Sequence, residues 1–90
     1  MPKIRYDREN CEGFFICVAA DPDTWIENSD DNKADLEGGT QKGEIWEKEI
    51  SEDELDDAEA AADGCPVDVI QVLDDDGNVV AGPDKLPVEE

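Results

Sequence analysis

The stretch CEGFFIC, residues 11–17, sets two cysteines six positions apart, and a third cysteine stands at position 65. Three is an odd number, so these cysteines fit a disulfide framework poorly. Reduced thiolates are instead free to hold metal, and soft metals favour them as ligands. The plain structural alternative is that each free cysteine is a small buried hydrophobe. The spacing makes a metal centre the first hypothesis for this segment.

The segments on either side of this stretch carry short strand and helix patterns. Ile4 and Tyr6 alternate with polar neighbours, which is the two-residue period of a half-buried strand. The apolar run beginning at Phe14 should end as a helix at Asp21, because a residue before proline avoids helical geometry. From the N-terminus we therefore expect a strand at residues 3–7, a helix at 14–20 and a hairpin formed by 24–29 and 33–36.

The second half of the chain predicts a clearer helix. Ser51 can cap it, and Glu54 three residues on completes a capping box. Gly64 fits a left-handed exit just past the helix end. One face of this helix is apolar at helical spacing: Leu55, Ala58 and Ala62. A β-branched run then predicts a strand within residues 65–73, followed by a turn at 74–78 and a final short strand at 79–80.

The chain is short, and its 90 residues make one small domain whose own core leaves a thin margin of stability. Residues 37–43 are a Gly-rich polar connection, and residues 44–50 show no clean apolar face, so they form either an extra strand or a surface excursion. The last residues carry two prolines and no period. We expect a single domain at 1–82 with an insertion at about 37–50, and a loosely ordered tail at 83–90.

Acidic residues dominate the composition. The chain has 27 Asp and Glu against 7 Lys and Arg, which gives a formal net charge of -20. Such charge can indicate disorder, but the apolar residues are gathered into segments and the acids are spread along the chain. We therefore favour a halophilic protein, because concentrated salt screens the repulsion among its acids. The same balance argues against nucleic acid, which is bound through Lys and Arg.

Two further observations bear on location. No apolar run approaches the ~20 residues that span a bilayer. The N-terminal residues MPKIRYDREN lack the apolar core of a signal peptide. We expect a cytoplasmic monomer without a membrane partner.

The order of strand, cysteine loop, helix, hairpin, helix, Cys-Pro and strand resembles single-cluster bacterial and archaeal ferredoxins over roughly residues 3–80. In that family the ligand loop runs C-x2-C-x2-C, and a distant C-P closes the set. Here Cys11 and Cys17 match the first and third cysteines, Phe14 stands in place of the second, and Cys65-Pro66 matches the last. The stretch CVAADPDTW is also similar to the family. The resemblance implies an α+β fold, a ferredoxin-like βαββαβ order with two short helices packed on small antiparallel sheets.

Family members that lack the second cysteine look like the 3Fe-4S type, so the resemblance implies a 3Fe-4S cluster ligated by the three cysteines. One thiolate is then available for each iron. Phe14 has no lone pair for a fourth metal, but its ring can shield the corner of the cluster where a fourth iron would sit. Gly13 eases the tight path of the loop, whose backbone N–H groups can turn toward the sulfides. A 4Fe-4S cluster with hydroxide or Glu12 on the fourth iron is the less favoured alternative.

Cys65 contributes differently, because it would tie the second helix and the last strand to the N-terminal loop. Pro66 should end that helix and aim the thiolate. The apolar shell of the cluster would then be Ile4, Phe15, Val18, Trp25, Leu55, Ala58, Val67 and Ile70.

Other chemistries fit the sequence less well. Zinc usually takes four Cys or His ligands, and this chain has three Cys and no His. The acidic stretch DPDTWIENSDDN begins like a calcium loop but has Ile26 where the sharp turn needs glycine. No nucleophile–base pair is available without His. We therefore expect no enzymatic activity.

The resemblance implies a low-molecular-weight one-electron carrier. Its partners would be redox proteins, such as a reductase, another oxidoreductase or a haem-thiolate mono-oxygenase. The alternative function is a ferredoxin-like structural or interaction module that carries no redox cluster, a possibility that the phenylalanine at position 14 keeps open.

Overall fold

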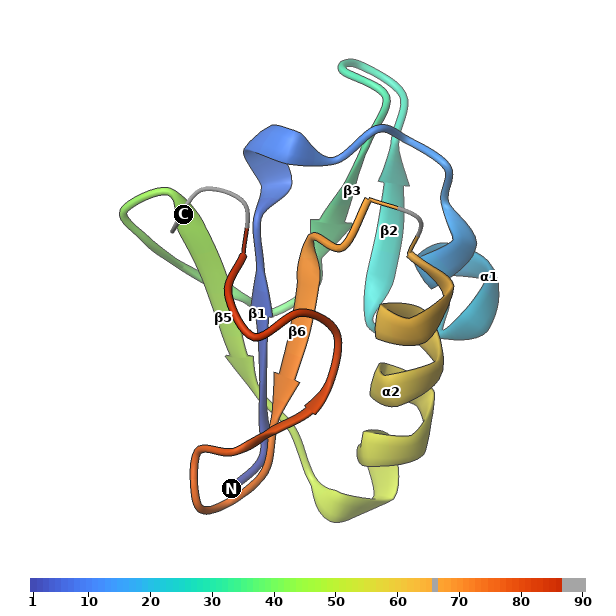
Figure 1. Cartoon of the computed structure of the whole chain (residues 1–90). Coiled ribbons are helices and arrows are strands. Elements are labelled where there is room, and N and C mark those ends of the chain that lie inside the picture. Colours follow the sequence, from blue (N-terminus) through green and yellow to red (C-terminus); the bar gives the residue numbers. More distant parts are fainter. Residues whose placement is uncertain (66, 87–90) are drawn as a thin grey trace.

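The computed structural model describes residues 1–65 and 67–86, and this part of the chain folds into two antiparallel sheets with two α-helices beside them (Figure 1). The five-stranded sheet has the order β4-β5-β1-β6-β7, and the two-stranded sheet pairs β2 with β3. The strands are β1 (Lys3–Tyr6), β2 (Trp25–Asn28), β3 (Lys33–Leu36), β4 (Thr40–Lys42), β5 (Ile45–Glu49), β6 (Ile70–Leu73) and β7 (Val79–Ala81). The helices are α1 (Ile16–Ala20) and α2 (Leu55–Gly64), with 3-10 turns η1 (Arg8–Asn10) and η2 (Glu52–Glu54).

The predicted α+β architecture is confirmed at the level of small antiparallel sheets with few helices. The predicted first strand, the hairpin, the short first helix and the final strand are all present. The observed order differs from βαββαβ because β4 and β5 stand between the hairpin and α2, and β7 follows β6. β5 is a full member of the large sheet.

β1 lies at the centre of the five-stranded sheet. It pairs antiparallel with β5 on one side and with β6 on the other, so that Ile4 stands opposite both Lys48 and Val72. Ile4 and Tyr6 are fully buried, and their neighbours in the strand are only partly buried. The alternation predicted for this strand is therefore the one observed.

Residues 44–50 gave no clear pattern because β5 is held by backbone pairing on both sides more than by one apolar face. Ile45 is buried, whereas Trp46 and Lys48 are half-buried. β4 pairs with one edge of the strand and β1 with the other. The strand alternative holds for residues 45–49.

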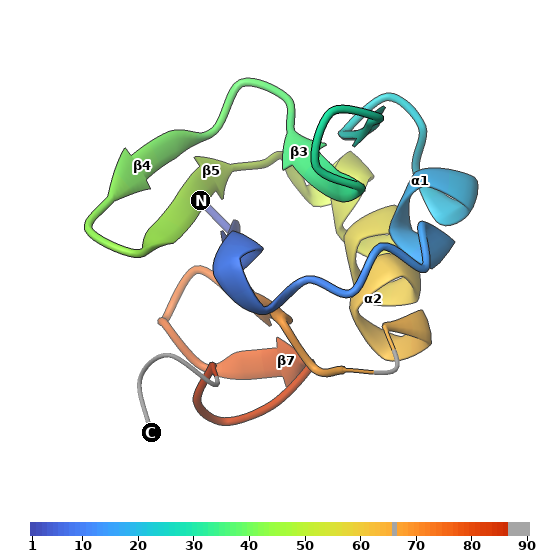
Figure 2. The ribbon, with the colours of Figure 1, turned by 90° about the horizontal axis from the view of Figure 1, so that it is seen from above.

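The two α-helices pack against each other on the side of the hairpin (Figures 1 and 2). α2 also contacts β6 and β7 of the large sheet and buries Ala58, Ala61 and Ala62 against them and α1. α1 ends as predicted, with the N–H of Asp21 donating to the carbonyl of Cys17. The predicted helix with its buried face at Ala58 and Ala62 is therefore present as α2.

Both predicted ends of α2 are wrong in detail. The Ser51 hydroxyl donates to a carboxylate oxygen of Glu54 at 3.2 Å and makes no cap to the backbone, because the chain enters through the 3-10 turn η2. Gly64 is the last helical residue and does not have a positive φ. A Cβ at Gly64 would lie 2.6 Å from Cγ2 of Ile16. The glycine serves the close approach of the two helices, not a left-handed exit.

The segment after β7 is anchored as far as it is described, which differs from the predicted loose tail. The buried side-chain amide of Gln71 donates to the carbonyls of Pro83 at 3.0 Å and Asp84 at 2.8 Å. Leu86 is fully buried. A single anchoring leucine leaves no periodic signal, which is why the pattern missed it. Residues 87–90 of the predicted tail lie outside the described part.

The core lies among the large sheet, the two helices and the hairpin. Tyr6 and Trp25 meet at its centre edge to face, with ring centroids 4.8 Å apart. The residues predicted as an apolar shell all belong to this core: Ile4, Trp25, Ala58 and Ile70 are buried, and Phe15, Val18, Leu55 and Val67 are partly buried against it. Among the described residues, no helix has the length and apolar character needed to cross a membrane.

Candidate functional site

The three cysteines line one cavity at the end of the helices. Cys11 follows η1, Cys17 lies in α1, and Cys65 comes directly after α2. All three are free thiols, and Cys17 is buried whereas the other two are half-buried. The cavity is small and partly open to solvent, and its wall consists of the cysteines with Glu12, Gly13, Phe14, Phe15, Ile16 and Val67. The fold therefore brings thiols from both halves of the chain together.

The loop between the first two cysteines bends sharply twice. Gly13 has a φ of 75°, and Phe15 has a φ of 58° immediately before α1. A left-handed conformation costs a non-glycine residue roughly 1–2 kcal/mol. The strained backbone at Phe15 was not predicted, because the sequence pattern of residues 14–20 indicated an ordinary helix there. The two bends wrap the loop around the cavity.

Gly13 has two reasons to be glycine. Its positive φ is unfavourable for other residues. A Cβ at this position would also clash with the backbone carbonyl of Asn32, in the turn of the β2–β3 hairpin. The cysteine loop thus rests directly on the hairpin.

The thiol of Cys17 is electrostatically coupled to the other two cysteines. Burial, followed by the charge of Cys11 and more weakly that of Cys65, raises the pKa of Cys17 to about 11. The backbone N–H groups of Val18 and Cys17 lie near the sulfur and act in the opposite direction, lowering the pKa. Three thiolates around one cavity repel each other unless a cationic centre compensates them, and metal coordination deprotonates a thiol outright. The donor set therefore suits a positively charged metal core.

The arrangement does not suit a single ion. Within residues 1–65 and 67–86, no three or more His, Cys, Asp or Glu side chains are grouped so that they could hold one metal ion. A single zinc would require its thiolates to share a centre at about 2.3 Å from each sulfur. A cluster binds each thiolate through a different iron, so it accepts sulfurs that are farther apart.

A family model for the 4Fe-4S single cluster domain matches residues 4–72. The chain belongs to this family. The match includes all three cysteines and extends from β1 to β6. A search of curated proteins found no match. This single-cluster ferredoxin-type protein is thus an iron–sulfur electron carrier and not an enzyme.

Phe14, the residue that distinguishes this ferredoxin-type loop from C-x2-C-x2-C, stands at the mouth of the cavity. Its side chain lines the cavity, yet 60% of the residue remains exposed, and Ile16 beside it is 41% exposed. Phe14 therefore borders the cavity and covers it only in part. Cys65 has an extended backbone (φ -74°, ψ 113°) that ends α2. The predicted role of Pro66 in that ending concerns a residue outside the described part.

Tyr6 is a site residue that the sequence pattern identified only as a strand position. Its buried hydroxyl donates to the carbonyl of Ala34 at 2.8 Å. The same hydroxyl lies within hydrogen-bonding reach of Cys11, and burial together with that thiol raises the pKa of Tyr6 far above its usual range. The sequence feature that could have identified this site residue is a side chain with a polar hydroxyl on a core strand, shortly before the first cysteine.

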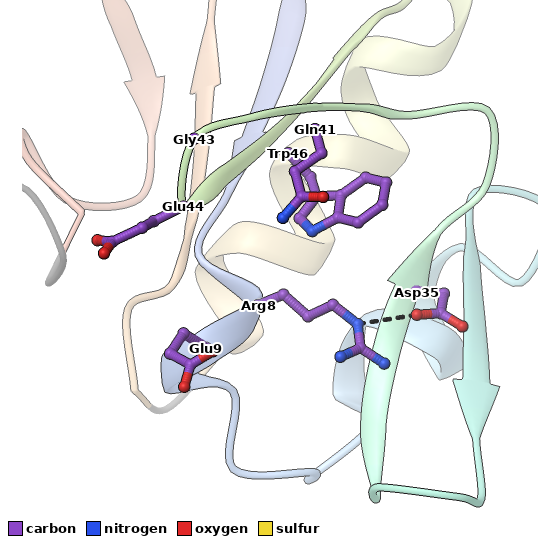
Figure 3. A pocket seen from close by; sticks show the side chains of 7 residues that line it. All are labelled: Arg8, Glu9, Asp35, Gln41, Gly43, Glu44 and Trp46. Carbon is purple, nitrogen blue, oxygen red and sulfur yellow. Dashed lines mark hydrogen bonds and ion pairs between the residues drawn. The ribbon is translucent and has the colours of Figure 1, made fainter.

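A second, larger hollow lies between η1, β3 and the β4–β5 hairpin (Figure 3). Its lining residues are Arg8, Glu9, Asp35, Gln41, Gly43, Glu44 and Trp46. Nε of Arg8 pairs with Asp35 at 2.8 Å, so this guanidinium is engaged within the wall. None of these lining residues carries a thiol.

Proposed function

We propose that the chain is a one-electron carrier with a 3Fe-4S cluster, and that Cys11, Cys17 and Cys65 each ligate one iron. The observation that carries this proposal is the convergence of three thiols on one cavity whose remaining wall offers Phe14 at the position of the family's second cysteine. A phenyl ring has no lone pair for a metal. When bound, the cluster supplies reversible one-electron chemistry, and the protein supplies ligands and a low-polarity surrounding.

The residues around the cavity have separate parts in this proposal. The apolar shell limits access of water to the iron, and N–H groups at the start of α1 lie near the sulfur of Cys17 and favour its thiolate form. Tyr6 provides a hydroxyl next to Cys11. Glu12 lines the same cavity, so a 4Fe-4S cluster with a carboxylate as fourth ligand is the second candidate.

The exposed rim suggests how a redox partner approaches. Phe14 and Ile16 are exposed at the cavity mouth of a chain whose net charge is -20. In concentrated salt, charge steering is short-ranged, and apolar contacts at close range gain weight. We infer that partners such as a reductase, an oxidoreductase or a haem-thiolate mono-oxygenase place an apolar spot surrounded by basic residues over this rim. The electron is then transferred across the side of the cavity that Phe14 and Ile16 border.

Electron paramagnetic resonance of anaerobically purified protein tests the cluster type. An oxidised 3Fe-4S centre is paramagnetic, whereas an oxidised 4Fe-4S centre is silent, so the oxidised protein should give a signal. The substitution Phe14→Cys adds the missing thiolate and should yield an oxidised protein that is brown and silent. Phe14→Leu is the matched control and should keep the signal.

Two outcomes would contradict the proposal. A brown, silent, oxidised wild-type protein would show four irons and favour Glu12 or hydroxide as the additional ligand. A colourless wild-type protein would favour the structural or interaction module without a redox cluster.

A further inference from the structure

Lys33, on the β2–β3 hairpin, binds the backbone of the segment that leads into the cysteine loop. Its Nζ donates to the carbonyl oxygens of Arg8 at 3.2 Å, Glu9 at 2.8 Å and Cys11 at 3.1 Å. An ammonium has three N–H donors, so all of them are directed at one short stretch of chain. A flexible surface lysine would not lose its conformational freedom in this way without a compensating set of bonds.

The strand that carries Lys33 explains its direction. Ala34 and Leu36 point into the core, so Lys33 and Asp35 stand on the opposite face of β3, toward η1. Arg8 reaches back to the same hairpin, with Nε 2.8 Å from Asp35 and a terminal nitrogen 2.7 Å from Asp31. Each of the two segments, the hairpin and the cysteine-bearing segment, therefore contributes a side chain that binds the other.

The contact continues into the loop itself. Gly13 passes so close to the carbonyl of Asn32 that a Cβ would not fit. Asn32 is the residue before Lys33, so the hairpin turn supports the loop at Gly13 while the lysine fixes it at Cys11. Movement of the hairpin would move the first cysteine.

We propose that Lys33 is a positioning residue of the iron–sulfur site, which orients Cys11 through its carbonyl and contributes a positive charge beside it. This inference rests on the proposed function. Reduction adds one negative charge to the cluster, and a fixed cation nearby favours the reduced form. The chain has only 7 Lys and Arg against 27 Asp and Glu, so positive charges are few. The half-buried ammonium of Lys33 lies beside Cys11, and the more distant acids do not cancel its effect on the potential of the site. Lys33 therefore raises the reduction potential of the site.

The experiment compares three variants by two measurements on the protein as isolated. Lys33→Met removes the donors and the charge, and Lys33→Gln keeps amide donors but removes the charge. Lys42→Met is the matched control, because it removes the same charge from the exposed edge strand β4, where Lys42 pairs with Glu47 at 3.2 Å. The measurements are the midpoint potential of the cluster and the rate of amide hydrogen exchange in residues 8–17.

In Lys33→Met we expect a lower midpoint potential and several-fold faster exchange in residues 8–17, with unchanged exchange in β1 and β6. Lys33→Gln should lower the potential with a smaller change in exchange, and it also covers the case in which Lys33→Met does not fold. Lys42→Met should resemble the wild type in both measurements. A Lys33 variant that folds and matches Lys42→Met in potential and in exchange would overturn the proposal.

The two measurements also separate this inference from the proposed function. Hydrogen exchange reports on the bonds from Lys33 whether or not the protein contains iron. A wild-type protein without a cluster, but with faster exchange in Lys33→Met, would contradict the proposed function and retain the structural link. A brown protein whose potential and exchange do not respond to position 33 would contradict only the inference.

Discussion

The five-stranded sheet and the cysteine end are stabilised in different ways. In the sheet, β1 is paired on both edges and its apolar side chains, such as Ile4, are fully buried. At the cysteine end, Gly13 and Phe15 have positive φ angles, and a lysine from another strand binds the chain. The sheet is maintained by repeated backbone pairing and apolar burial, whereas the cysteine end depends on a few specific contacts. Substitutions should therefore affect the two regions differently.

The largest effect is expected for Cys65→Ser, which removes the proposed ligand that would connect α2 and β6 to the N-terminal loop. We expect loss of the brown colour and a lower free energy of unfolding. By analogy with a cross-link that closes a loop of about fifty residues, the loss is on the order of 4 kcal/mol. Thermal unfolding under anaerobic conditions measures it. Removal of iron from both proteins is the control, since it should make the two unfolding curves nearly the same.

Gly13→Ala should have the next largest effect, because the new Cβ meets both a positive φ and the carbonyl of Asn32. Gly43→Ala is the matched control: Gly43 has a φ of 66°, but nothing lies within 4 Å of its would-be Cβ. The control should cost about 1–2 kcal/mol of stability. Gly13→Ala should cost clearly more, as measured by urea unfolding. Equal losses would mean that the loop does not rest on the hairpin.

These two variants also indicate what the sequence could and could not predict. The strand at Ile4 is a local pattern, and the structure has it where the pattern predicts it. The cysteines also stand out by their spacing, and all three line one cavity; their role as ligands stays a prediction. The left-handed exit predicted at Gly64 is wrong, because the constraint on this glycine is the side chain of Ile16, which lies 48 positions earlier. The periodicity of a short segment gives no information about its contacts with segments that are distant in the sequence.

The supporting residues of the site were missed for a similar reason. Lys33 binds backbone carbonyls, and any sequence provides carbonyls, so no partner residue signals the contact. Tyr6 was correctly predicted as a buried strand residue, but its proximity to Cys11 depends on the turn η1 between them. The three cysteines can be singled out from the sequence, whereas the residues that support them can be identified only from the folded structure.

A smaller effect is expected in the sheet for Glu47→Gln. Burial raises the pKa of Glu47, but its hydrogen bond with Lys42 and the charges of Lys3, Lys42 and Arg5 outweigh burial and hold the pKa below its usual value. This carboxylate therefore contributes stability above the unfolded-state pKa of about 4.3, and the contribution is lost as the pH falls through the lower folded-state value. We expect a loss of about 0.5–1 kcal/mol at pH 7.

Urea unfolding of the wild type and Glu47→Gln at several pH values checks this prediction. The difference between the two proteins should shrink once the pH falls below about 4. The colour of the protein should not change, because Glu47 lies in the sheet and does not line the cysteine cavity. A difference that stays constant at acidic pH would show that the ion pairs of Glu47 do not stabilise the sheet.

The smallest effect is expected for Glu52→Gln. The carboxyl of Glu52 shares a hydrogen bond with Asp75, and this bond and the charge of Asp75 raise the pKa of Glu52. A raised acid pKa means that the pair opposes folding above that pKa and that stability increases as the pH falls through it. The substitution should therefore raise the melting temperature slightly in low salt and have no effect in molar salt, where charges are screened. An increase of the same size in both salts would contradict our proposal that screening by salt stabilises this acidic chain.

The count of iron and acid-labile sulfide per chain tests the central claim, that each iron is held by one thiolate, most directly. Anaerobically purified wild-type protein should contain three irons and four sulfides for each chain. Four irons with four sulfides would show that a ligand other than cysteine completes the site, and would contradict the claim.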